Sequence, residues 1–157
     1  MGPAYQRTTV RADLSALPAD LAAALRDHAE SRQLTITDDL PAWSTRSINP
    51  PASSTIGRLL GRRANPVDPD SENQTLVVLH PTHLLIVNSG AKRGISALSV
   101  PLGIASIGTP ESPDGFAVTG FAGESGRPGS YYLGVGEPQG EECREAVRAA
   151  IVAAKNS

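Results

Sequence analysis

The stretch spanning residues 74–88 constrains the fold more than any other part of the chain. Two apolar runs, 76–79 and 84–87, flank a His-Pro-Thr-His sequence. Each run has the length of a strand and is rich in Val, Ile and Leu, and Pro81 interrupts the pattern where a turn is needed. The stretch therefore predicts a β-hairpin at the centre of a sheet. Because both runs are apolar at every position, we expect both faces of the hairpin to be covered.

An N-terminal helix is predicted to cover one of these faces. Pro18 suits a first helical turn, and apolar residues then recur at steps of three and four: Leu14, Leu17, Leu21, Leu25 and Ala29. This pattern predicts a helix over about 18–32, preceded by a frayed segment, 1–13. Residues 42–48 predict the first strand, with Trp43, Thr45 and Ser47 on one face. We expect the helix to dock on the outer face or an edge of the sheet.

The second half of the chain predicts short strands and a closing helix. Alternating patterns joined by Gly- and Pro-containing turns favour strands near residues 95–100, 104–109, 116–121 and 131–135. The last predicted element is a helix over about 140–155, with one apolar stripe: Cys143, Ala146, Val147, Ala150, Ile151 and Ala154. We expect Val147 and Ile151 to lie in the main core.

Composition limits the classes of function. A chain of 157 residues has the length of one domain, and its net charge of -2 gives no electrostatic case for a nucleic-acid partner. The single Cys143 excludes an intrachain disulfide and a cysteine-based zinc site. No stretch resembles a signal peptide or reaches transmembrane length. These features together predict a cytoplasmic protein.

The predicted order of elements resembles the pleckstrin-homology (PH) superfold. The stretches TLVVLHPTHLLIVNSG and SALSVPLGIASIG are similar to successive strands of bacterial PH-like proteins, and GEPQGEECREAVRAAIVAAK is similar to their closing helix. The resemblance covers about 42–157 and leaves 1–41 as an N-terminal helical extension. It implies an α+β fold, with a bent antiparallel sheet or partly open barrel of about seven strands closed by the C-terminal helix. It also implies a binding or scaffolding module for a protein or peptide partner, and no reaction.

No residue pattern in the sequence completes a catalytic or metal-binding site. Ser125 lacks the Gly-x-Ser-x-Gly pattern of a nucleophile elbow, because Arg127 replaces the second glycine. His80 and His83 flank a turn, and we interpret them as hydrogen-bonded turn residues because no convincing set of four metal ligands can be assembled around them. The sequence therefore predicts no enzyme activity, no catalytic residue, no metal and no cofactor.

The remaining candidate site lies in a long predicted loop, 49–73. Within it, residues 56–63 place three aliphatic side chains beside three arginines: Ile56, Leu59, Leu60, Arg58, Arg62 and Arg63. Such a cluster suits an acidic protein surface or a phosphate-bearing ligand. By its position the loop is similar to the one with which many PH domains bind phosphorylated lipids. A protein or peptide partner is the leading prediction, and an anionic phospholipid head group, with peripheral membrane association, is the alternative.

Overall fold

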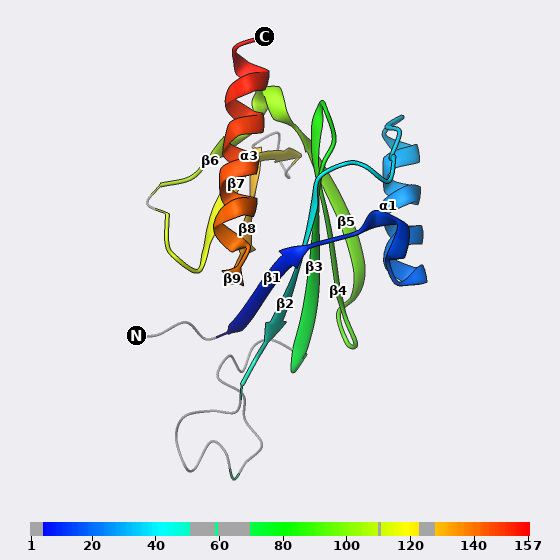
Figure 1. Cartoon of the computed structure of the whole chain (residues 1–157), viewed down its shortest axis with the longest axis vertical. Coiled ribbons are helices and arrows are strands. Elements are labelled where there is room, and N and C mark those ends of the chain that lie inside the picture. The colour runs from blue at the N-terminus through cyan, green and yellow to red at the C-terminus, as the bar shows by residue number, and fades with distance from the viewer. Residues whose placement is uncertain (1–4, 51–58, 60–69, 110, 123–127) are drawn as a thin grey trace.

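The computed structural model of the chain describes residues 5–50, 59, 70–109, 111–122 and 128–157. This part is an α+β structure with a mixed sheet of six strands, an antiparallel sheet of three strands and two α-helices (Figure 1). Its elements, in chain order, are β1 (Gln6–Arg11), η1 (Leu14–Ala16), α1 (Ala19–Ser31), β2 (Ala42–Ile48), β3 (Glu72–Leu79), β4 (His83–Gly90), β5 (Gly94–Pro101), η2 (Leu102–Ile104), β6 (Ser106–Ile107), β7 (Gly115–Ala122), β8 (Pro128–Gly134), β9 (Glu137–Pro138) and α3 (Gly140–Lys155).

The predicted hairpin is confirmed and lies in the middle of the larger sheet. The strand order is β5-β4-β3-β2-β1-β9 in that sheet and β6-β7-β8 in the smaller one. Strands β3 and β4 pair antiparallel from Leu79 opposite Leu84 to Asn73 opposite Gly90. The one parallel pair is β1 with β9, which makes the larger sheet mixed. The strands form two separate sheets, so no closed barrel is present among the described residues.

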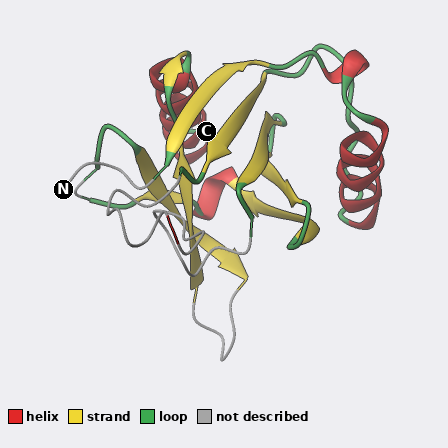
Figure 2. Cartoon of the chain, turned by 90° about the horizontal axis from the view of Figure 1, so that it is seen from below, coloured by secondary structure: helices red, strands yellow, loops and turns green. Residues whose placement is uncertain are grey.

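Two apolar layers cover the two faces of the hairpin, as its continuous apolar runs predict. On one face, α1 packs its buried stripe against β3 and β4, in a cluster that includes Leu21, Leu25, Ala29, Leu76, Val78, Leu85 and Val87. On the other face, Val77, Leu79, Leu84 and Ile86 pack against the smaller sheet and α3. Figures 1 and 2 show the two α-helices on opposite sides of the larger sheet. The predicted docking of the N-terminal helix and the burial of Val147 and Ile151 are both confirmed.

The prediction of a frayed N-terminus is wrong for residues 6–11, which form β1. This strand pairs antiparallel with β2 and parallel with β9. Its sequence is polar, but Thr9 is fully buried and its hydroxyl lies 2.7 Å from that of Thr45, so the hydrogen bond replaces apolar packing. The division into units at residues 41 and 42 stays a prediction. Strand β1, which precedes this boundary, pairs with β2, which follows it.

The strand predicted at 104–109 is shorter in the structure. Residues 102–104 form the 3-10 helix η2, and only Ser106 and Ile107 pair with β7. Pro101 is the last residue of β5 and caps this 3-10 helix, because its fixed φ and missing N–H are poorly suited to a longer strand. The remaining predicted strands correspond to β5, β7 and β8.

The chain contains three histidines, and all of them make hydrogen bonds at the edge of the apolar core. In the hairpin turn, the Thr82 backbone N–H donates to His80 Nδ1 at 3.1 Å, and the Thr82 hydroxyl lies 2.7 Å from His83 Nδ1. His28 Nε2 lies 2.9 Å from the Ser99 hydroxyl. The prediction that His80 and His83 flank the turn and form hydrogen bonds there is confirmed, with His83 as the first residue of β4. Because the Thr82 N–H points at it, His80 Nδ1 must be unprotonated.

This arrangement predicts that the protein loses stability as the pH falls below 6.5. Burial lowers the pKa of His28, His80 and His83 below 6.5, so the unfolded chain binds protons more readily than the folded one. The contribution of the neutral histidines to stability is therefore fully present above pH 6.5 and is lost as the pH drops through their folded-state pKa values. Urea unfolding at steps across this range measures the change. Replacing all three histidines with Gln should flatten the dependence, and an equally steep curve for that variant would assign it to other groups.

Candidate functional site

Of the six residues in the predicted recognition site, one lies in the described part of the chain. Leu59 is 81% exposed. The other five, Ile56, Arg58, Leu60, Arg62 and Arg63, lie outside the described residues, as does Ser125. The recognition site at 56–63 therefore stays a prediction.

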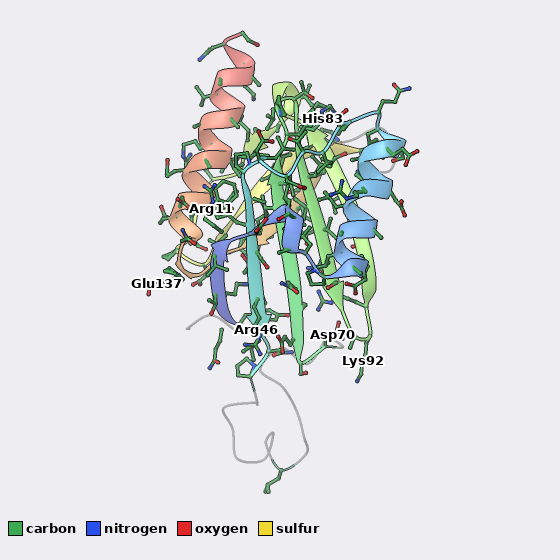
Figure 3. All side chains as sticks on the ribbon, turned by 45° about the vertical axis from the view of Figure 1, so that its right-hand side comes forward. Arg11, Arg46, Asp70, His83, Lys92 and Glu137 are labelled. Atoms are coloured by element: carbon green, nitrogen blue, oxygen red, sulfur yellow. The ribbon has the colours of Figure 1, made fainter. Side chains whose placement is uncertain are left out.

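The far end of the predicted loop returns to the sheet at a buried carboxylate, Asp70. Its side chain is 2% exposed and accepts hydrogen bonds from the Lys92 backbone N–H at 2.6 Å and from Arg93 Nε at 2.8 Å. These two bonds, with the Lys92 bond contributing more, hold the pKa of Asp70 below its usual value. Figure 3 places Asp70 and Lys92 at one end of the sheet, together with Arg46. Asp70 thus fixes the turn between β4 and β5 beside the point where the loop rejoins the fold.

The inner face of the larger sheet, which faces α3, changes from apolar to polar towards this end. One row across the strands pairs Thr9 with Thr45, Thr45 with Thr75, and Thr75 with Asn88. All four side chains are buried, and Asn88 Nδ2 donates to Thr75 Oγ1 at 2.7 Å. Because their hydrogen bonds are satisfied, these groups form a fixed support under the ends of the loop.

A concavity lies at the start of α3. It is a cleft of about 910 Å³, within the range of small-ligand and short-peptide sites. Three segments form its walls: the start of β1, the loop before β7, and the connection from β8 into α3. At Gly136 this connection passes so close to β1 that a Cβ atom would lie 2.1 Å from the Arg7 carbonyl oxygen. A larger residue there would push one wall of the cleft away from the sheet.

The base of the cleft is a hydrogen-bonded cluster around Arg144, which is 4% exposed. Its guanidinium donates to the carbonyl oxygens of Ser112 at 2.6 Å and Gly115 at 3.3 Å, and pairs with Glu111 at 3.2 Å. Arg148 Nη2 also donates to Glu111, at 2.5 Å. The Arg148 bond, followed by the Arg144 bond, lowers the pKa of the Glu111 carboxyl. The two arginines therefore attach the 111–115 loop to α3.

The rim of the cleft carries an excess of negative charge. Five carboxylates line the cleft against three guanidinium groups: Glu111, Asp114, Glu137, Glu141 and Glu145 against Arg7, Arg144 and Arg148. Glu141 and Glu145 pair with the arginines one turn further along α3. Within the described part of the chain, the Asp114 and Glu137 carboxylates form no ion pair or hydrogen bond.

No single sequence motif marks this cleft, because its walls come from opposite ends of the chain. Residues 5–7 lie against residues 111–114 and 135–148 only after both sheets have formed. One local pattern does mark its base. Glu141 with Arg144 and Glu145 with Arg148 repeat the same i,i+3 pair on one side of the closing helix. The pattern indicates an arginine row, but not the loop that it binds.

In comparisons with protein-family models, with curated proteins and with solved structures, nothing matches this chain. Among the described residues, no three His, Cys, Asp or Glu side chains gather as a metal site would require. Neither described α-helix combines the length and the apolar character needed to cross a bilayer.

Proposed function

We propose that this chain is a non-enzymatic PH-like module that binds a protein or peptide partner. The order of the elements supports the PH-like assignment. Strands β2 to β5 form one antiparallel meander, β6 to β8 form another, and α3 follows and packs in the core between them. This is the set of seven strands and one closing helix that the resemblance implies. Strands β1 and β9 and helix α1 are additions to it.

The cleft at the start of α3 is the observation that carries the binding function. It is concave, open and walled by three segments, and its base is fixed by the bonds of Arg144 and Arg148 to the 111–115 loop. A preformed site of this kind loses little conformational entropy on binding. Both polar and apolar groups line it, which suits a peptide with mixed side chains better than a uniformly apolar ligand.

Affinity capture on the immobilised full chain, followed by mass spectrometry, tests this function. The matched control is a column that carries the same chain after irreversible heat denaturation. We expect at least one protein to be retained by the folded chain alone and to bind it with a defined stoichiometry when both are purified. If no purified candidate forms such a complex, the binding function is contradicted.

A second candidate function is binding to an anionic phospholipid surface through residues 56–63. It is favoured by the loop's position, because the loop's end at Asp70 lies beside Lys92 and its sequence carries Arg58, Arg62 and Arg63. Replacing the three arginines with Ala should abolish co-sedimentation with phosphatidylserine vesicles and lower the melting temperature by only a few degrees.

The control for the lipid test changes the same net charge elsewhere. Arg26, Arg32 and Lys155 are exposed residues of the helices and their ends, and replacing these three with Ala should leave vesicle binding intact. Equal loss in both triple variants would show that net charge alone governs the association. Unfolding of the first variant would instead make its arginines structural.

A further inference from the structure

The cleft at the start of α3 selects the charge of its ligand. Its arginines are already engaged: Arg144 and Arg148 with Glu111, and Arg7 with the Ser47 hydroxyl at 3.2 Å. An anionic ligand would have to displace one of these partners. The Asp114 and Glu137 carboxylates, in contrast, are not engaged in the described structure. The surplus of two negative charges therefore favours a cationic ligand.

The lining also provides apolar surface beside the free carboxylates. Tyr5, Pro113, Val135 and Pro138 belong to the walls. Lysine and arginine side chains lay their methylene stems on apolar surface while the charged head pairs or stays in water. A bare metal ion would make no use of these walls, whereas a lysine or arginine side chain would.

Arg144 places a second requirement on the ligand, which is that it carries a hydrogen-bond acceptor. Its Nε is the one buried side-chain nitrogen or oxygen of the described residues that forms no hydrogen bond. Glu141 Oε1 lies 2.7 Å from it, close enough for an ion pair, but out of line with the N–H. A peptide carbonyl that takes the place of the Glu141 carboxylate, whose side chain is 72% exposed, would give this N–H an acceptor. A ligand that combines a carbonyl group with a nearby cation is a basic peptide, not a simple polyamine.

We propose that the cleft at the start of α3 binds a lysine- or arginine-bearing peptide segment, whose cations lie against Asp114 and Glu137 and whose backbone accepts from Arg144. This proposal rests on the proposed function and specifies the chemistry of the partner. It differs from recognition by residues 56–63, because those residues carry positive charge and would require an acidic ligand.

Fluorescence anisotropy with a labelled peptide of alternating Ala and Arg tests the proposal on the full chain. We expect saturable binding that weakens as salt rises, and no binding of the same peptide with Glu in place of Arg. The double variant Asp114→Asn, Glu137→Gln should weaken binding about tenfold, as expected for the loss of two exposed charge pairs. Spermidine, a cation without a carbonyl group, should compete poorly.

The matched control variant is Asp27→Asn, Glu30→Gln on α1. It changes the net charge by the same amount on the opposite side of the larger sheet, where both residues are exposed (Figure 1). We expect its affinity to stay within about twofold of the wild type. Equal weakening in both double variants, strong competition by spermidine, or no binding of the Arg peptide would each overturn the proposal.

The captured protein partner separates this proposal from the proposed function. A partner that binds the Asp114→Asn, Glu137→Gln variant as tightly as the wild type overturns the proposal and leaves the binding function in place. If neither the Arg peptide nor any protein binds, both fail. Loss of the partner together with the Arg peptide supports both.

Discussion

A chain that lacks residues 1–33 is expected to lose its soluble, folded state. The deletion removes α1, which covers the outer faces of β3 and β4, and it also removes β1. Leu76, Val78, Leu85 and Val87, now buried, would then face water across two adjacent strands. Burial of each such side chain contributes about 1.5–3 kcal/mol, so the combined loss is comparable to the whole stability of an ordinary domain. Loss of β1 would also expose the backbone groups along one edge of β2.

Soluble yield, size-exclusion chromatography and circular dichroism of the shortened chain measure this effect. A matched pair of point variants isolates the contribution of α1. Leu25→Asp places a charge in the buried face of the helix and should destabilise strongly, whereas Ala23→Asp on the exposed face should not. A shortened chain that stays monomeric and melts like the wild type would show that residues 42–157 fold without this extension.

The features that could be predicted from the sequence are those with a local periodic pattern. The apolar runs 76–79 and 84–87 predict the hairpin, and the stripe ending at Ala154 predicts α3, because each element alone determines its pattern. Strand β1 lacks such a pattern. Its buried residue is a threonine, and its place in the sheet comes from pairing with β2, where Thr9 lies opposite Thr45, 36 residues away. Nothing within six consecutive residues could indicate that partner.

The candidate site is even harder to predict from local sequence patterns. Residues 56–63 attract notice because their arginines and aliphatic residues are adjacent in sequence. The cleft instead combines Arg7, Asp114 and Arg144, which only the finished fold brings together. Its key carboxylates, Asp114 and Glu137, lie in Pro- and Gly-containing segments that the sequence identifies only as loops. A pattern within one segment can show an arginine row on α3, but not which carboxylates remain unpaired around it.

Replacing Arg144 with Met should lower the unfolding free energy by about 1.5–3 kcal/mol, the range for hydrogen bonds made by a charged group. The Met side chain fills much of the same volume, so the loss is electrostatic and not a cavity effect. The carbonyl oxygens of Ser112 and Gly115 would lose the guanidinium and keep the backbone hydrogen bonds that they exchange with each other, and Glu111 would keep only Arg148. The 111–115 loop should then detach from α3, since its bonds to Arg144 are the main ones that hold it there.

Arg148→Met is the matched control, one turn further along the same helix. Arg148 is 38% exposed and also pairs with Glu111, but it donates to no backbone carbonyl of the loop in the described structure. Its replacement should lower the unfolding free energy much less than that of Arg144, because water can replace the missing partner. Urea unfolding gives both values, and hydrogen exchange of the Gly115 amide reports on the loop. If the two variants are equally stable, Arg144 does not anchor the loop, and the base of the cleft is not the fixed platform on which peptide binding depends.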